Sequence, residues 1–277
     1  MNPDEYCRQK AVASGSSLYY SLLFLPSERR RALTALCAYC KELRDVVDAV
    51  SDAHVARTKL AWWRLEVGKL FDGNQSHPVM HALRPVIPGT GIQAEQLSQV
   101  IDGMEMDLAQ SRYLDFTGLS RYCDMAAGAP ASAAARILGS SSAGTLAYAA
   151  NLGTALQLTR IIRNVGADAR KNRIYLPMDE LKRFDLPASD ILLSRHSDGF
   201  AKLMAFQARR AETFYAKAIG LLPAEDRRAQ RSGLILAALQ RATLAEIERD
   251  GFRVLTHRTS LTPLRKFWLA WKTWVTA

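Results

Sequence analysis

The chain has 277 residues, of which 48% are hydrophobic and 23% are charged, and its formal net charge is +10. This length suits one domain with a large core, and no apolar run reaches the roughly 18 to 20 residues that a membrane-spanning helix needs. We therefore expect a single domain over residues 1–277 that does not cross a membrane. The positive charge favours an anionic partner, but no nucleic-acid-reading motif is present, so nucleic acid is not the expected partner.

The cysteine pattern does not predict disulfide bonds. Cys7, Cys37, Cys40 and Cys123 are far apart except for one pair, and no secretory leader precedes them. Disulfide frameworks belong to small secreted domains rather than to chains of this kind. We therefore expect a protein of the reducing cytoplasm.

Helix-forming residues dominate from Ser27 onward, with apolar residues at three- and four-residue spacing, so we expect an all-α fold. Ser27 is the expected N-cap of a first helix that ends near Val50. Its apolar stripe is Leu33, Leu36, Cys40, Leu43, Val47 and Val50. Further helices are expected at 52–71, 93–112, 116–138, 141–169, 197–222 and 228–251.

Two of these helices carry a polar face beside their apolar stripe, because successive residues of an α-helix rotate by about 100°. The first helix gathers Cys37, Lys41, Arg44, Asp45 and Asp48. The helix from 141 gathers Gly153, Gln157, Arg160, Asn164 and Asp168, with Arg163 to one side. Carboxylates on facing helices can hold magnesium ions that bind a diphosphate. The alternative is that both faces are solvated and contain ion pairs, such as Arg44 with Asp48.

The C-terminal segment 264–275 has an apolar helical face with basic residues elsewhere. The face consists of Leu264, Phe267, Trp268, Trp271, Trp274 and Val275. Such a helix can lie on an anionic membrane surface, or the same face can pack against the bundle as its last helix. The first alternative predicts a peripheral protein on the inner membrane face.

Two sequence blocks carry a family resemblance. The stretch Ser-Ser-Leu-Tyr-Tyr at 16–20 and the stretch Lys-Glu-Leu-Arg-Asp-Val-Val-Asp at 41–48 resemble the opening of bacterial squalene/phytoene synthases. The block Gln-Leu-Thr-Arg-Ile-Ile-Arg-Asn-Val-Gly-Ala-Asp at 157–168, followed by Arg-Ile-Tyr-Leu-Pro at 173–177, resembles the second aspartate-rich helix of that family. The resemblance runs from near Tyr6 to near Trp274. The opening, the stretch 61–64 and the segment 264–274 are most similar to the bacterial presqualene diphosphate synthases, HpnD.

The resemblance implies a class I isoprenoid-synthase-like helical bundle with a central cavity. It also implies a head-to-head condensation of two farnesyl diphosphates to presqualene diphosphate, assisted by Mg²⁺. One diphosphate would leave to give an allylic cation, which the double bond of the second substrate attacks to close a cyclopropane. The protein would stabilise the leaving group, orient the substrates and exclude water.

The resemblance also assigns roles to individual residues. The metal-binding and catalytic positions are matched by Asp45, Asp48 and Asp168, and Tyr175 is a further catalytic candidate. The positions around the diphosphate are matched by Ser17, Lys41, Arg163, Arg173 and Arg258, with Lys41 in place of the usual arginine. Positions beside the cavity are matched by Cys37, Tyr122, Gln157, Asn164 and Arg241.

Several of these positions depart from the family pattern. Arg44 and Asn164 stand where aspartate is usual, Arg160 replaces a polar amide, and Cys37 and Arg241 replace tyrosines. The replacements make the site more basic by about five charges, which disfavours a magnesium cluster. Two hypotheses follow. The chain is an active prenyltransferase in which Arg44 and Arg160 pair with the carboxylates or bind phosphate. Alternatively, it is a catalytically degenerate member that binds prenyl diphosphate or lipid phosphate, or serves as an assembly factor.

Overall fold

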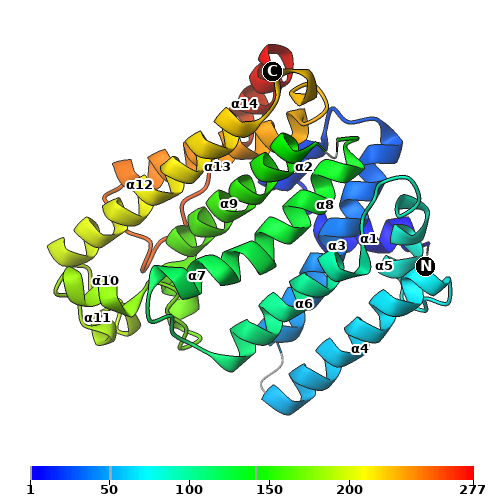
Figure 1. The fold of residues 1–277 in the computed structure, drawn as a ribbon. Helices are drawn as coiled ribbons and strands as arrows, with labels where there is room; N and C mark the ends of the chain where they lie inside the picture. The colour runs from blue at the N-terminus through cyan, green and yellow to red at the C-terminus, as the bar shows by residue number, and fades with distance from the viewer. Residues whose placement is uncertain (1, 50–51, 141) are drawn as a thin grey trace.

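A computed structural model describes residues 2–49, 52–140 and 142–277, and Figure 1 shows helices joined by loops. The longer helices are α3 (Ser27–Ala49), α4 (Ala53–Asp72), α6 (Ala94–Ala109), α9 (Ala143–Ala169), α12 (Asp198–Leu221) and α13 (Arg231–Arg249). The shorter ones are α1 (Pro3–Ala11), α2 (Ser17–Leu22), α5 (Pro78–Leu83), α7 (Phe116–Cys123), α8 (Ala129–Ile137), α10 (Met178–Arg183), α11 (Ala188–Leu192) and α14 (Pro263–Thr276). Single turns are η1 (Arg84–Val86), η2 (Asp124–Gly128) and η3 (Ala224–Asp226). The all-α prediction is confirmed.

Side-chain caps fix the starts of three long helices close to where the sequence predicts them, whereas Ser27, the expected N-cap of α3, is its first helical residue. Asp52 accepts hydrogen bonds from the first turn of α4, and Ser142 and Ser197 do the same for α9 and α12. The predicted helix 116–138 is instead α7, the π-helical η2 and α8 in succession. Two predicted positions, Val50 in the first stripe and Ser141 at the start of α9, lie outside the described residues.

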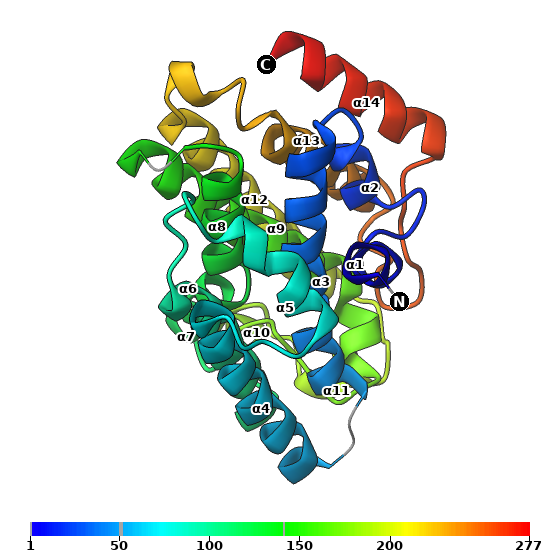
Figure 2. The same ribbon diagram turned by 90° about the vertical axis from the view of Figure 1, so that its right-hand side faces the viewer.

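Helix α9 occupies the middle of the bundle. It packs against α12 on one side and against α8 and η2 on the other (Figure 1). Helix α3 packs on α1, α5, α6 and α8, while α4 lies outside, against α6. Figure 2 shows α14 at one end of the molecule and α4 at the opposite end. None of the helices within the described ranges has both the length and the apolar character needed to span a bilayer.

The predicted apolar stripe of α3 fixes how this helix sits in the core. Leu33, Leu36, Leu43 and Val47 are all buried, and Cys40 is partly buried. Burying one such side chain stabilises a fold by roughly 1.5 to 3 kcal/mol. The stripe therefore fixes the rotation of α3 about its axis, and its members Leu33, Leu36 and Cys40 line a space that residues of α9 also line.

A close approach of backbones fixes α9 on its other side. A Cβ atom at Gly153 would overlap the carbonyl oxygen of Ala127 in η2, so this contact requires glycine. The Thr154 hydroxyl donates a hydrogen bond of 3.1 Å to Asp124 at the start of η2. The widened π-turn thus lies directly on the face of α9 that lines the candidate site.

Candidate functional site

An apolar cavity of about 300 Å³ lies between α3 and α9. Helix α3 lines it with Leu33, Leu36, Cys37 and Cys40, and α9 lines it with Tyr148, Ala149, Leu152, Gly153 and Leu156. Residues of α2, α8 and α13 close the other sides. The two helices with predicted polar faces therefore face each other across an apolar space of the size that small-molecule sites have.

Both helices become polar one turn beyond the cavity lining. On α3, Lys41 and Arg44 follow Cys37 and Cys40 at four-residue spacing, and on α9 Arg160 follows Leu156 in the same way. Residues four apart share one helix face, so the apolar lining continues directly into charged groups. The arrangement suits a ligand with an apolar chain and an anionic head.

The segment that follows α9 is anchored on the connection between α6 and α7. The Ile174 N–H donates to the Ser111 carbonyl at 3.0 Å, and the Met178 N–H donates to the Tyr113 carbonyl at 2.9 Å. Residues 174 and 112 also form an isolated β-bridge, the one β interaction found in the described part of the chain. This anchoring directs the side chains of Arg173 and Tyr175 toward α3 and α6.

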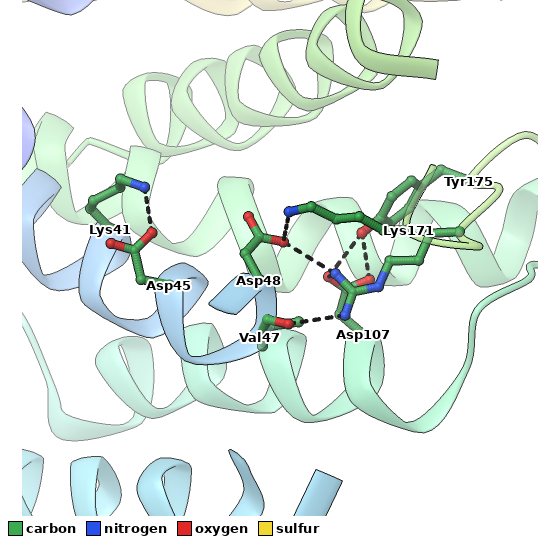
Figure 3. A network of polar contacts seen from close by, with 8 residues as sticks. Lys41, Asp45, Val47, Asp48, Asp107, Lys171 and Tyr175 are labelled. Atoms are coloured by element: carbon green, nitrogen blue, oxygen red, sulfur yellow. Dashed lines mark hydrogen bonds and ion pairs between the residues drawn. The ribbon is translucent and has the colours of Figure 1, made fainter. Parts of the chain in front are cut away.

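Those two side chains join the helices through carboxylates (Figure 3). The Tyr175 hydroxyl lies 2.7 and 2.9 Å from the two oxygens of Asp107 on α6. Arg173 lies 3.2 Å from an Asp48 oxygen and 3.8 Å from an Asp107 oxygen, and it donates to the Val47 carbonyl at 3.1 Å. Burial raises the pKa of Tyr175, with Tyr122 and Asp107 adding to the shift, so its phenol is a neutral donor.

Asp107 is a site residue that the sequence analysis missed. Only 3% of it is exposed, and it accepts hydrogen bonds from Tyr175. A signal was present in the sequence: Asp107 continues the buried stripe of Val100 and Met104 at helical spacing. A carboxylate within an apolar stripe needs a partner, because an unpaired buried charge is costly.

Tyr122 and Gln157 lie beside Arg160 rather than on the cavity wall. The Tyr122 ring is buried and stacks on Tyr175 at 5.5 Å, and the Arg160 guanidinium lies 5.4 Å from the centre of the Tyr175 ring. The Gln157 side chain accepts a hydrogen bond of 3.2 Å from Arg160 Nε. Gln157 and the Tyr175 ring therefore contact the Arg160 guanidinium directly, and Tyr122 packs on the Tyr175 ring.

Arg241, which the resemblance places beside the cavity, is not among the residues that line it in the described part of the chain. Its side chain is 45% exposed and forms an ion pair of 2.8 Å with Glu212 on α12, which gives the guanidinium a partner at the surface. Cys37 does line the cavity, while Asn164 is partly exposed on α9 and Ser17 is the first residue of α2. The gain in positive charge at the site is thus about four rather than five charges, counted from Arg44, Arg160 and Asn164.

The three predicted metal ligands do not fit a magnesium cluster. Asp45 is paired with Lys41 and, at 3.0 Å, with Lys10. Burial opposes its charge, but these lysines outweigh burial and hold the pKa of Asp45 below its usual value. Asp48 is paired with Arg173 and, at 3.3 Å, with Lys171 (Figure 3). Within the described ranges, no three metal-ligating side chains gather.

Asp168 is the exception among these carboxylates. Its Oδ2 atom is buried and has no hydrogen-bond partner in the described part of the chain. Burial raises its pKa, and the charges of Asp48 and Asp107 add to the shift, although Arg160 and Arg44 oppose it. The charges that act on Asp168 thus come from both helices, from Arg44 and Asp48 on α3 and from Arg160 on α9.

Replacing Asp168 by asparagine is expected to raise the melting temperature at pH 7. Because the folded-state pKa of Asp168 is raised, the native protein binds more protons than the unfolded chain, and stability falls as pH rises through the raised value. Asparagine removes this penalty, so the gain over the parent chain should grow from pH 4 to pH 7. Thermal unfolding of both proteins across this range checks it, and a lower melting temperature of the variant at pH 7 would contradict it.

A second group of cations comes from α9, from the loop after α13 and from α14. We call Arg160, Arg163, Arg258 and Lys266 the cation cluster. Burial lowers the pKa of Arg163, and the charges of Arg258 and Arg160 lower it further. Lys266 has a lowered pKa from burial and from Arg163 and Arg258, and its ammonium donates to the Gly15 carbonyl at 2.8 Å. Neighbouring cations therefore oppose the charges of Arg163 and Lys266, whereas Tyr122, Tyr175 and Asp168 raise the pKa of Arg160 despite its burial.

The chain is thus an all-helical bundle with an apolar cavity whose lining continues along two helices into cationic side chains. The family model for squalene/phytoene synthase matches residues 11–265 of this chain. The chain is therefore a member of the squalene/phytoene synthase family, whose members are prenyltransferases acting on prenyl diphosphates.

Known relatives and structures agree with this assignment. The chain is 30% identical to the phytoene synthase of Arthrospira platensis, over 95% of this chain and 89% of that protein. It is also 30% identical to a chloroplastic phytoene synthase of an Oncidium hybrid cultivar, over 94% of this chain, but it spans only 65% of that relative's length. The fold is that of a dehydrosqualene synthase, with a TM-score of 0.87 at 21% identity over 98% of this chain and 95% of that one. Squalene synthase HpnC from Alicyclobacillus acidocaldarius gives a TM-score of 0.79 at 24% identity, over 90% and 94%.

Proposed function

We propose that this protein condenses two farnesyl diphosphates head to head to presqualene diphosphate. The observation that carries the proposal is the apolar cavity between α3 and α9 that continues directly into Arg44 and Arg160. The cavity suits a prenyl chain, and the cationic end suits the diphosphate. The family's prenyltransferase chemistry supplies the reaction class.

In the proposed reaction, the bond between C1 and the diphosphate oxygen of one substrate breaks, and the double bond of the second substrate attacks C1. Breaking of the C1–O bond releases inorganic diphosphate, which can accept the proton that is lost as the cyclopropane closes. Cationic side chains aimed at the departing diphosphate stabilise the charge that develops there. The apolar lining keeps water from the allylic cation.

A second function is favoured by the carboxylates of α3, which already form ion pairs. Because Asp45 and Asp48 are each paired with two cations, the site suits tight binding of a prenyl diphosphate or lipid phosphate without turnover. Such a member of the family would hold the ligand as a binding or assembly protein.

Product analysis separates the two functions. The purified chain is incubated with farnesyl diphosphate, with and without magnesium, and the extract is examined by mass spectrometry for a C30 diphosphate. The condensation predicts presqualene diphosphate, with at least a tenfold loss in Arg160→Gln, since a charge-assisted contact contributes roughly 1.5 to 3 kcal/mol. Bound farnesyl diphosphate that is recovered unchanged would overturn the condensation and support the binding function.

We further propose that α14 contacts an anionic membrane surface. Five apolar side chains on its outer face are exposed: Leu264, Phe267, Trp268, Trp271 and Val275. Lys272 lies against Trp268 on this face, with its ammonium 5.1 Å from the ring centre. Aromatic side chains flanked by basic ones, on a chain of net charge +10, suit a negatively charged lipid surface. Trp274, which the sequence placed on the same face, instead packs on Phe24 at 5.6 Å.

Vesicle binding tests this surface. The chain is expected to sediment with vesicles of phosphatidylcholine and phosphatidylglycerol, and less with phosphatidylcholine alone. Trp268→Glu and Trp271→Glu should each weaken binding about tenfold, because a carboxylate replaces apolar area at the interface. Leu65→Glu is the matched control, since Leu65 is 65% exposed on α4 at the opposite end of the molecule (Figure 2). Equal losses in all three variants would contradict a contact through α14.

A further inference from the structure

We infer that the cation cluster binds the diphosphate of a prenyl diphosphate directly, without a divalent ion between protein and ligand. This inference rests on the proposed function for the identity of the ligand. The family resemblance implies a magnesium-dependent site instead. In this chain, however, the carboxylates Asp45 and Asp48 form ion pairs with lysines and arginine.

The cation cluster carries positive charge that has no counter-ion in the described part of the chain. Among the ion pairs formed within the described ranges, none involves a member of the cluster. The Nη2 atom of Arg160 and the Nε atom of Arg163 are buried and have no hydrogen-bond partner in the described part of the chain. Buried guanidinium donors without partners are costly, so a ligand that accepts from them would relieve this cost.

The neighbouring carboxylates do not balance the positive charge of the cation cluster. Asp168 and Asp107 both act on Arg160, but Asp107 already accepts from Tyr175 and lies near Arg173, and Asp168 makes no ion pair within the described ranges. Asp45 and Asp48 are engaged by lysines and by Arg173. A diphosphate brings several negative charges and many acceptor oxygens, which match planar guanidinium donors.

The α9 members of the cation cluster follow the apolar cavity lining along the same helix. Arg160 follows Leu156 of the cavity lining by one helical turn, and Arg163 follows it by two. Lys266 is bound to the Gly15 carbonyl, immediately before α2, whose Leu18 also lines the cavity. A ligand with its chain in the cavity would thus present its head to the cluster.

Titration calorimetry with inorganic diphosphate, on the full chain in EDTA, tests the inference. We expect binding in EDTA that added magnesium does not strengthen, and we expect it to weaken as salt rises. Arg160→Gln and Arg163→Gln should each weaken it about tenfold, the loss of one charge-assisted contact. Arg241→Gln is the control, because it removes the same charge from an exposed position. Circular dichroism verifies that each variant is folded.

The outcomes separate this inference from the proposed function. Binding in EDTA that is lost in the cluster variants and kept in Arg241→Gln supports direct binding, whether or not product forms. Binding that appears only with magnesium overturns direct binding, even if presqualene diphosphate is made. Equal weakening by Arg241→Gln would also overturn it, because the effect would then come from net charge alone.

Discussion

Replacing Gly166 by alanine is expected to lower the free energy of unfolding by about 3 kcal/mol, at the upper end of the usual cost of overpacking. A Cβ atom at this position would overlap the carbonyl group of Leu255 in the loop after α13. Neither backbone is free to move, since Leu255 is buried and Gly166 lies within α9. The loop would have to shift away from α9, and it carries Arg258 of the cation cluster.

Chemical denaturation of the variant measures this effect. Gly68→Ala is the matched control, because Gly68 lies inside α4 and a Cβ atom there would meet nothing within 4 Å. Alanine at this helical position should stabilise the chain by about 0.5 to 1 kcal/mol. An unchanged free energy of unfolding in Gly166→Ala would show that α9 and the loop do not pack as described.

Asp107→Ala is expected to cost about 3 kcal/mol, because removing one partner leaves the others buried and unpaired. The Tyr175 hydroxyl would lose its acceptor, and Arg173 would lose one of its two carboxylates. The segment 170–179 would then be held by its backbone hydrogen bonds to 111–114 and by the contacts of Arg173 with Asp48 and Val47. We also expect faster hydrogen exchange of the amides in this segment.

The matched control for that change is on the same helix. Asp102→Ala removes a carboxylate of α6 that pairs with Arg64 at 2.7 Å, but both of these side chains are at least 40% exposed. An exposed pair contributes less than about 1 kcal/mol, so this variant should be nearly as stable as the parent. Similar losses in both variants would contradict a special role of the buried Asp107.

The sequence predicts the fold well where the signal is local. The spacing of Leu33, Leu36, Leu43 and Val47 defines the buried side of α3, and capping residues define helix starts. The sequence does not predict the break of 116–138 into three parts, in which the π-turn η2 packs against Gly153 of α9. A contact between segments that distant leaves no pattern in either one.

The candidate site is harder to predict from the sequence, because its contacts join residues that are far apart in the chain. The ion pair between Lys10 and Asp45 joins α3 to α1, a helix that the sequence analysis did not predict. Arg241 was assigned to the cavity by resemblance, yet its environment is set by Glu212 on another helix. Asp107 could have been recognised as a carboxylate in an apolar stripe, but its partner Tyr175 could not.

A crystal structure with farnesyl thiodiphosphate, grown with manganese present, tests the central claim most directly. That claim is that the cavity and the cation cluster form one prenyl diphosphate site. We predict the farnesyl chain between Cys37 and Gly153, with the diphosphate oxygens within hydrogen-bond distance of Arg160 and Arg163. An empty cavity, or a diphosphate bound through manganese at Asp45 and Asp48, would contradict it.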